Sequence, residues 1–457
     1  MVNGFDRRVL WVFAIAFALA ALLTKTHTDS CNDMSRIAAI DSLAERHTFR
    51  IEQSPWGGTC DRYTYAGHFY SDKEPLLIVM GAVVELAMRP FHVSFVTNFP
   101  LAYYLVTLFT VGLCFAAGTA YAYVLARLLG LSERIALVAC GLMAVATPVL
   151  TWAVVLANHV PCGMAVLAGA THCILARRGA PAHAFLAGLF IAIAAAFDAA
   201  AVVFFLIPLF VLPRRSAVSW IAATLGALPL LAAQAAFNLH FSGSVIPPAM
   251  NGNVWDYPGS LFKHHYLTLG VVGSADAYKD YAWYLTFGDK GLFTYSPAVV
   301  LCIWGLVLMW RNRGEQRILA AGIAASCAVF LVLTFLFTDD HSAGNYGERR
   351  YADFLALLCV ALGPLLAAIR SRWAVWAVRL VVLAGIVMEA IGTVSPWTGN
   401  PGFTWNLDRF HTIWLHAPWS AAIDVLGFLG VVVVAMRAIR AARGESVLRP
   451  NDQPSWA

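Results

Sequence analysis

The chain has 457 residues, of which 60% are hydrophobic and only 12% are charged, and its mean hydropathy is +0.68. Soluble domains carry about 25% charged residues, so this composition excludes an ordinary water-soluble enzyme. The formal net charge is +5, but no basic face is interleaved with aromatic residues, and we expect no nucleic-acid partner. The sequence predicts an all-α, polytopic integral membrane protein.

Apolar stretches of roughly 20 residues, the length that crosses a bilayer as a helix, recur along the whole chain. They predict a single domain of about twelve membrane-spanning helices, the first of which is a retained helix and not a cleaved signal peptide. The fifth and sixth spans are short, and Asp198 lies at their junction. The predicted spans are residues 8–26, 99–126, 134–151, 155–176, 184–197, 198–212, 217–236, 292–310, 318–337, 351–369, 373–393 and 419–439.

Arginine residues are concentrated in alternate short connections between these spans. By the positive-inside rule these connections are cytoplasmic, so both termini are cytoplasmic and the polar loops face the other side. We expect a multi-pass protein of the bacterial inner membrane whose functional loops are periplasmic. The arginines behind this assignment are Arg7, Arg8, Arg127, Arg134, Arg177, Arg178, Arg214, Arg215, Arg311, Arg313, Arg317, Arg370, Arg372, Arg437, Arg440 and Arg443.

The longest polar segment is the predicted periplasmic loop at residues 27–98. Apolar residues recur at helical spacing in its first part, and Asp33 stands where an N-cap is expected. This pattern predicts an interfacial helix with Asp41 and Glu45 on its solvated face. A second apolar stretch at residues 78–91 is too short to cross a bilayer and predicts another interfacial or re-entrant segment.

Between these two segments, the stretch GHFYSDKEPLL at residues 67–77 places polar side chains beside an apolar run. It is either a solvated turn ended by Pro75 or a phosphate-binding corner at the membrane boundary. Because proline disfavours helix in the residue before it, we expect Glu74 to be extended, with Lys73 directed into a cavity. His68 and Tyr70 are expected to line the approach, and Asp72 and Glu74 either orient the lysine or face water.

Three further polar segments fall on the same predicted side. The Asn158-His159 pair follows the third span and is either a helix cap or part of a site. Residues 237–291 are rich in glycine, proline and aromatic residues, as expected of a loop that covers a substrate. The loop at residues 338–350 ends in the Arg349-Arg350 pair, which either anchors the chain or binds an anion, because the arginine fork suits phosphate.

Cysteine placement leaves one question open. Seven of the nine cysteines fall in predicted spans and are expected to pack as small apolar residues. Cys31 and Cys60 both lie in the first periplasmic loop, where an oxidising compartment permits a disulfide. The sequence does not show whether the two are close enough to form one.

Together these stretches resemble the GT-C superfamily of glycosyltransferases, in particular the lipid A aminoarabinose transferases and the protein O-mannosyltransferases. GHFYSDKEPLL is similar to the Y-x-x-K-P-P-L element of their first outer loop, with Glu74 where the first proline usually stands. NDMSRIAAIDSLAERHTFRIE, with an acid just after the first span, resembles their catalytic loop. NHVP, GLFTYSP and GNYGERRYADF resemble further motifs of bacterial members.

The resemblance implies a hexosyl or pentosyl transferase that moves a sugar from a polyprenyl-phosphate-linked donor to a glycan, lipid or protein acceptor at the periplasmic face. Such a donor fits the predicted topology, because nucleotide sugars are cytoplasmic. The reaction is an inverting displacement at the anomeric carbon with the lipid phosphate leaving. It requires a carboxylate that takes the acceptor proton and cations that stabilise charge on the phosphate.

By this resemblance Asp33 is the general base, with Asp29 as its competitor, and Lys73, Arg349 and Arg350 bind the donor phosphate. Many relatives carry a second carboxylate after the third span, where this chain has an Asn-His pair, and no zinc-ligand spacing is present. We therefore expect no metal and no other cofactor. The side chains expected to line the substrate cavity are Arg36, His68, Tyr70, Asn158, His159, His341 and Tyr346.

Two other functions are compatible with the sequence. A transporter or flippase of lipid-linked glycans has the same topology, but transporters tend to place polar elements near the bilayer midplane in corresponding halves. Here Asp198 and Glu389 are the only acids expected deep in the membrane, and no repeat relates them. A transferase-like scaffold without activity has the same sequence features.

Overall fold

The architecture comes from a computed structural model, which describes residues 7–260, 275–337, 344–397 and 418–442. Helices dominate the described residues, as the composition predicts, and one two-stranded sheet accompanies them. The first half contains α1 (Arg7–Leu23), α2 (Cys31–Arg46), β1 (Arg62–Tyr65), β2 (His68–Ser71), α3 (Pro75–Met88), η1 (Arg89–Phe91), α4 (Phe99–Thr107), the π-helical turn η2 (Leu108–Gly112), α5 (Leu113–Leu128), α6 (Glu133–Val145), α7 (Val149–Ala153), α8 (His159–Arg177), α9 (Pro181–Phe197), η3 (Ala199–Phe205), α10 (Leu206–Val211) and α11 (Ala217–Ser242). The second half contains η4 (Pro248–Met250), η5 (Gly252–Val254), α12 (Ala275–Thr286), α13 (Leu292–Tyr295), α14 (Ala298–Arg311), α15 (Glu315–Phe337), η6 (Arg349–Tyr351), α16 (Ala352–Leu358), η7 (Cys359–Ala361), α17 (Leu362–Ala368), α18 (Arg372–Val394) and α20 (Pro418–Ala442).

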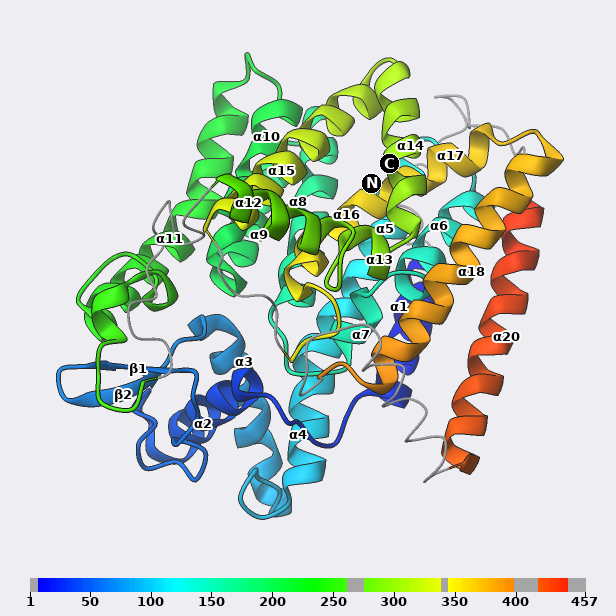
Figure 1. Ribbon diagram of the computed structural model, residues 1–457. Coiled ribbons are helices and arrows are strands. Elements are labelled where there is room, and N and C mark those ends of the chain that lie inside the picture. Colours follow the sequence, from blue (N-terminus) through cyan, green and yellow to red (C-terminus); the bar gives the residue numbers. More distant parts are fainter. Residues whose placement is uncertain (1–6, 261–274, 338–343, 398–417, 443–457) are drawn as a thin grey trace.

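The two ends of the helical bundle carry different parts of the chain. Figure 1 shows α2, α3 and the β1–β2 hairpin together at the lower end, whereas the turns from α10 to α11 and from α14 to α15 lie at the upper end. Those turns carry Arg214 with Arg215 and Arg311 with Arg313. The long polar loop and these arginine-rich turns therefore lie at opposite ends of the bundle, as the predicted topology requires.

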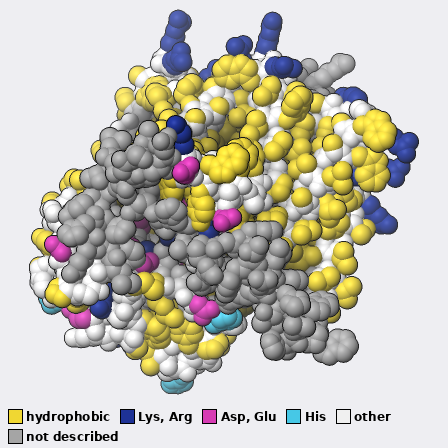
Figure 2. Space-filling view, in the orientation of Figure 1, with side chains coloured by type: hydrophobic (Ala, Val, Ile, Leu, Met, Phe, Trp, Pro, Cys, Tyr) yellow, Lys and Arg dark blue, Asp and Glu magenta, His cyan; other side chains and the backbone are white. Residues whose placement is uncertain are grey.

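The surface and the helix lengths are those of a membrane protein. Figure 2 shows a broad apolar surface on this face, with Lys and Arg side chains projecting along its top and right edges. In the described part of the chain, seven helices are long and apolar enough to cross a membrane, and three shorter apolar helices accompany them. The predicted count of twelve remains a prediction. The seven are Phe99–Leu128, His159–Arg177, Ala217–Ser242, Glu315–Leu336, Arg349–Ala368, Arg372–Val394 and Val425–Ala442.

Helix α8 is the central element that positions the site. It packs against α5, α9 and α16, and nearly all of its residues are buried inside the protein. Gly163, one turn into α8, lies against α16: a Cβ there would stand 2.2 Å from the Ala352 carbonyl oxygen. Only glycine permits this approach, which brings the first residues of α8 beside those of α16.

Helix α2 forms where the sequence predicts it, but it is more buried than an interfacial surface helix. Its N-cap is Ser30, whose Oγ accepts from the Asn32 amide at 3.1 Å, and Asp33 lies inside the first turn. The expectation of a capping Asp33 is therefore wrong. Asp41 is also fully buried and ion-pairs with Arg46, which corrects its assignment to a solvated face.

The first loop also contains a β-hairpin that the all-α prediction missed. Strands β1 and β2 pair antiparallel around Ala66 and Gly67, which have φ values of 49° and 80°. The pairing of Tyr63 with Tyr70 places both rings in a small buried cluster with Trp255, beside Phe241. The hairpin is thereby packed onto the segment that follows α11.

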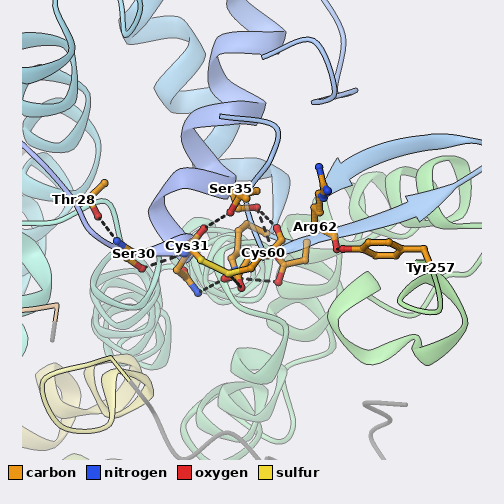
Figure 3. Close-up of a disulfide and its surroundings, with 12 residues drawn as sticks. Thr28, Ser30, Cys31, Ser35, Cys60, Arg62 and Tyr257 are labelled. Atoms are coloured by element: carbon orange, nitrogen blue, oxygen red, sulfur yellow. Dashed lines mark hydrogen bonds and ion pairs between the residues drawn. A yellow bond between two sulfur atoms is a disulfide. The ribbon is translucent and has the colours of Figure 1, made fainter. Parts of the chain in front are cut away.

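A disulfide ties the start of α2 to the start of the hairpin. Cys31 and Cys60, which the sequence left unassigned, are bonded with their Cα atoms 5.8 Å apart. Figure 3 shows the bond beside Ser35, with the Tyr257 hydroxyl donating to the Arg62 carbonyl nearby. Because Lys73 follows β2 by two residues, this crosslink fixes both Asp33 and Lys73 on one small unit.

Candidate functional site

Asp33 lies buried at the start of α2 and keeps one carboxylate oxygen without a hydrogen bond. Its Oδ2 accepts from the Tyr103 hydroxyl at 2.5 Å and from the Trp397 indole N–H at 3.1 Å. Its Oδ1 has no hydrogen-bond partner in the described part of the chain and stands 3.7 Å from an Arg36 nitrogen. Burial raises the pKa of Asp33 against the opposing effects of Arg36 and of the Tyr103, Thr28 and Trp397 side chains.

Arg36 connects α2 to the residues that precede α8. Its Nη2 donates to Asn158 Oδ1 at 2.6 Å, and its Nη1 donates to the Leu156 carbonyl at 3.1 Å and to Asn32 Oδ1 at 2.5 Å. Asn158 in turn donates to Asp198 Oδ2 at 3.2 Å. A continuous chain of polar contacts therefore runs from the first loop to the junction between α9 and η3.

Lys73 is held between two carboxylates. Its Nζ lies 2.8 Å from Asp61 Oδ2 and 2.8 Å from Asp72 Oδ2. Ser35 of α2 joins this group, since its hydroxyl lies 2.5 Å from the Asp61 carbonyl oxygen and 3.3 Å from Asp72 Oδ1. Asp72 thus orients the lysine, as one of the two sequence interpretations proposed.

The charges around Asp61 show which cations converge on this group. Burial alone would raise the pKa of Asp61, but the Lys73 ammonium, then Arg349 and Arg36, hold that pKa below its usual value. Burial raises the pKa of the neighbouring Asp72, and Asp61 adds to that effect. Three cations from distant parts of the sequence therefore act on one carboxylate.

Glu74 has the expected extended backbone, with φ −58° and ψ 138°, and begins α3 with Pro75. Its side chain neither orients the lysine nor faces water, because the Gln234 amide of α11 donates to it. Burial, then Asp198 and Asp72, raise the pKa of Glu74 to about 8. Glu74 is therefore mainly protonated at neutral pH.

His159 meets two acids at the first residue of α8. Its Nδ1 lies 3.1 Å from Asp353 Oδ1 and 3.3 Å from Asp198 Oδ2. Asp353 is fully buried in α16, which corrects the expectation that Asp198 and Glu389 are the only deep acids. Glu389 is also fully buried and accepts from Thr151, so it supports α7 beneath this group.

Arg349 and Arg350 lie in η6, immediately before α16. Among the described residues, Asn345 is the hydrogen-bond partner of Arg349, at 3.1 Å. Arg350 lies 3.4 Å from Glu348. Both arginines act electrostatically on Asp198, so they belong to the same group of charges. We call the whole group the charged cluster: Asp33, Arg36, Asp61, Asp72, Lys73, His159, Asp198, Glu348, Arg349, Arg350 and Asp353.

The other predicted cavity residues lie elsewhere or are enclosed. His68 pairs with Glu52 at 2.7 Å on the hairpin, and Tyr70 stacks on Tyr63. Tyr346 has no exposed surface, and its hydroxyl donates to the Met388 carbonyl at 2.5 Å. His341 lies outside the described residues.

Sequence reasoning missed four members of the site. Asp61 and Asp353 contact Lys73 and His159, while Tyr103 and Trp397 hold Asp33. Only Asp61 carried a local signal, because it follows Cys60 in the loop already identified. The contacts of the other three span long sequence separations, and no spacing rule predicts them.

An apolar cavity of about 740 Å³ lies between α9, η3, α10 and α11. Asp198 lies four residues before Val202, which lines the cavity, and Gln234 lies three residues after Leu231, which also lines it. Residues three apart on an α-helix share a face, so Gln234 continues the face of α11 that lines the cavity, and its amide donates to Glu74. The lining is Gly188, Val202, Val203, Phe205, Leu206, Pro208, Leu209, Trp220, Ala223, Thr224, Ala227, Leu228, Leu231 and Val329.

Comparisons with known proteins show which solved structures share this architecture. No protein-family model matches the sequence, and no curated protein matches it. Among solved structures, ArnT from Cupriavidus metallidurans, bound to undecaprenyl phosphate, aligns with a TM-score of 0.56 at 11% identity, covering 96% of this chain and 76% of its own. The oligosaccharyltransferase AglB from Archaeoglobus fulgidus, with an inhibitory peptide and a dolichol-phosphate, aligns with a TM-score of 0.53 at 14% identity.

The chain has the GT-C fold. Both neighbours are GT-C glycosyltransferases, and the alignments extend over nearly the whole of this chain, as the resemblance in the first loop predicts. The alignment with AglB covers 97% of this chain but 65% of AglB, so this chain spans just under two thirds of that enzyme's length. At these identities the likeness establishes the fold, and the activity rests on the residues of the site.

Proposed function

We propose that this protein is a membrane glycosyltransferase that uses a polyprenyl-phosphate-linked sugar as donor and Asp33 as general base. One observation carries the proposal: the buried Asp33 carboxylate has one oxygen without a hydrogen bond and lies in a charged cluster that contains Arg36, Lys73, Arg349 and Arg350. The fold supports it, since both GT-C neighbours were solved with polyprenyl-type lipid phosphates. The acceptor is a glycan, lipid or protein hydroxyl, and the reaction takes place at the periplasmic face.

Asp33 suits the role of base because its two oxygens have different surroundings. Tyr103 and Trp397 fix Oδ2 and thereby the plane of the carboxylate, while Oδ1 remains available to accept a proton. The raised pKa of Asp33 makes it a stronger proton acceptor than an ordinary surface aspartate. Arg36, 3.7 Å away, and the hydrogen bonds to the carboxylate oppose that rise.

The donor phosphate requires cations that the protein has not already paired. Arg349 is best suited, because it has one hydrogen-bond partner among the described residues and its planar fork can donate two further hydrogen bonds. Lys73 contributes positive charge from a fixed position between Asp61 and Asp72. Glu74, which replaces a proline of the related motif, does not repel the phosphate because it is mainly protonated at neutral pH.

The apolar cavity accounts for the lipid part of the donor. Its volume of about 740 Å³ lies in the usual range for ligand sites, about 300–1,000 Å³. Gln234, three residues after the lining residue Leu231 on α11, donates to Glu74, the residue that follows Lys73. We place the isoprenoid chain in this cavity, with its phosphate on the side of Glu74 and Lys73.

The transfer step then follows from the two groups. The acceptor hydroxyl oxygen attacks the anomeric carbon, and Asp33 Oδ1 takes its proton. The bond from the anomeric carbon to the phosphate oxygen breaks, and its electron pair leaves with the polyprenyl phosphate. The configuration at the anomeric carbon inverts. Arg349 and Lys73 stabilise the negative charge that grows on the departing phosphate.

Mass spectrometry of cells with and without the gene tests this proposal. Loss of the gene should cause one polyprenyl-phosphate-linked sugar to accumulate and one envelope glycan, lipid or protein to lose that sugar. A strain that carries Asp33→Asn should show the same change at a normal protein level. If the lipid-linked sugar instead changes sides of the membrane without being consumed, the protein is a flippase and the proposal fails.

A further inference from the structure

We propose that His159, Asp198 and Asp353 bind a divalent metal cation at a site that does not include Asp33. The three side chains come from the start of α8, the junction between α9 and η3, and the start of α16. One imidazole nitrogen and one oxygen of each carboxylate all lie within 4.8 Å of one another. This inference departs from the expectation of no metal, which rested on the Asn-His pair and on ligand spacing in the sequence, and it is independent of the proposed sugar transfer because it is tested by binding.

The donor separations have the size expected for two ligands that share a metal. His159 Nδ1 lies 3.1 Å from Asp353 Oδ1 and 3.3 Å from Asp198 Oδ2. Two ligands that each lie about 2.0–2.2 Å from a metal, at tetrahedral or octahedral angles, are about 2.9–3.5 Å apart. A single N–H···O hydrogen bond of about 2.7–3.2 Å accounts for the contact with Asp353 but not for the longer contact with Asp198.

Proton counting also argues against a purely hydrogen-bonded arrangement. One imidazole Nδ1 carries at most one proton, yet it faces two carboxylates at nearly equal distances. Among the described residues, His159 is the ion-pair partner of both Asp198 and Asp353. A bound cation satisfies all three atoms at once, and His159 then coordinates through Nδ1 in its neutral form.

The charge of the surroundings favours a cation at this point. Six carboxyl groups lie in the charged cluster against four cations, and the cations already contact other members: Arg36 lies near Asp33, Lys73 joins Asp61 and Asp72, and Arg350 joins Glu348. Arg349 is the cation that we assign to the donor phosphate. A buried group with excess negative charge is costly, and it becomes more so when a phosphate arrives.

The surroundings also hold the ligands in place and leave an opening. Asn158 donates to Asp198 Oδ2 at 3.2 Å, and the Ala200 amide donates to Asp198 Oδ1 at 3.0 Å. Such partners orient ligands in known metal sites. The Asp353 side chain has no exposed surface, whereas 19% of the Asp198 side chain is exposed. Further ligands can therefore enter on the Asp198 side, and a mixed nitrogen and oxygen set suits Mn²⁺ or Zn²⁺.

The test uses the full-length protein in detergent, stripped with EDTA and then titrated with Mn²⁺ under electron paramagnetic resonance. The wild type should bind one Mn²⁺ per chain, and Asp198→Asn or Asp353→Asn should weaken that binding at least tenfold. His183→Ala removes a histidine from the first turn of α9, away from the site, and should bind normally. If Asp33→Asn lowers binding as much as Asp353→Asn does, the metal lies elsewhere and the inference is wrong.

Thermal unfolding separates the metal site from a structural His–Asp pair even if a variant folds poorly. Without metal, Asp353→Asn should raise the melting temperature, because it removes a carboxylate that lacks a cation. Mn²⁺ should raise the melting temperature of the wild type and leave that of Asp353→Asn unchanged. A variant that melts lower than the wild type both with and without Mn²⁺ would identify a structural pair and overturn the inference.

Discussion

Replacing Asp33 by Asn removes the proton acceptor and keeps most of the local structure. The asparagine carbonyl can still accept from Tyr103 and Trp397, the partners of Oδ2. Arg36 retains its bonds to Asn158 and Leu156, so the loss of one charge does not leave the guanidinium without partners. We expect a change of about 1–3 kcal/mol in the free energy of unfolding, the range for altering a buried polar group.

The effect of this substitution on transfer should be much larger. A positioned general base contributes roughly 10²–10⁴-fold to the rate, which corresponds to about 3–5 kcal/mol in the activation barrier. The measurement is single-turnover transfer by the purified protein in nanodiscs, with the donor that the comparison of cells identifies. Binding of undecaprenyl phosphate, measured by native mass spectrometry, should be nearly unchanged, because Asp33 does not contact the phosphate in this mechanism.

Two further results bear on the same assignment. The wild-type rate should fall as the pH falls through the pKa of Asp33, since only the ionised form accepts a proton, and burial places that limb above the ordinary value near 3.9. Asp29→Asn is the matched control and should retain activity. A nearly normal Asp33→Asn protein beside an inactive Asp29→Asn protein would refute the assignment of the base.

The remaining predictions concern the phosphate, the crosslink and the topology. Glu74 ionises as the pH rises through about 8, so the wild type should bind undecaprenyl phosphate less tightly above that pH than below it. Glu74→Gln should bind it equally tightly on both sides of pH 8. The same dependence of binding on pH in both proteins would show that Glu74 does not face the phosphate. Lys73→Ala should weaken this binding and slow transfer, Lys73→Arg should keep part of both, and normal values for Lys73→Ala would reduce the lysine to a structural role. Cys60→Ser opens a disulfide across 29 residues and should cost roughly 3–4 kcal/mol in the free energy of unfolding; an unchanged melting temperature would contradict this. A cysteine placed at the exposed position Gln53 should react with a membrane-impermeant maleimide from the periplasm, whereas one at the exposed position Arg313 should react only after lysis. The reverse pattern would invert the topology.

The sequence predicts those features that depend on local pattern and on composition. The apolar runs predict the membrane helices, and Pro75 predicts both the extended Glu74 and the start of α3. The sequence contained a signal for the hairpin around Gly67: aromatic residues alternate with polar ones on both sides of an Ala-Gly turn. The prediction missed it because the strands are short and lie in a mainly helical chain.

The site itself was only partly predictable, because its contacts join remote segments. Asp33 and Lys73 were identified from one loop, but their partners Tyr103 and Asp61 emerge only in the folded chain. Asp353 lies at the start of the predicted span 351–369 and was not assigned to the site, whereas α16 buries it completely beside His159. A one-dimensional pattern reports which face of a helix is apolar, but it does not report which polar side chain meets it from the next helix.

A structure of the full chain in a nanodisc with undecaprenyl phosphate would test the central claim most directly. The account predicts a phosphate within hydrogen-bonding distance of Arg349, beside Lys73, with the isoprenoid chain in the cavity lined by Val202 and Leu231. The free oxygen of Asp33 should face the side of the phosphate where the sugar is attached. A phosphate bound away from both cations, or a lipid chain on another face of the bundle, would contradict the account.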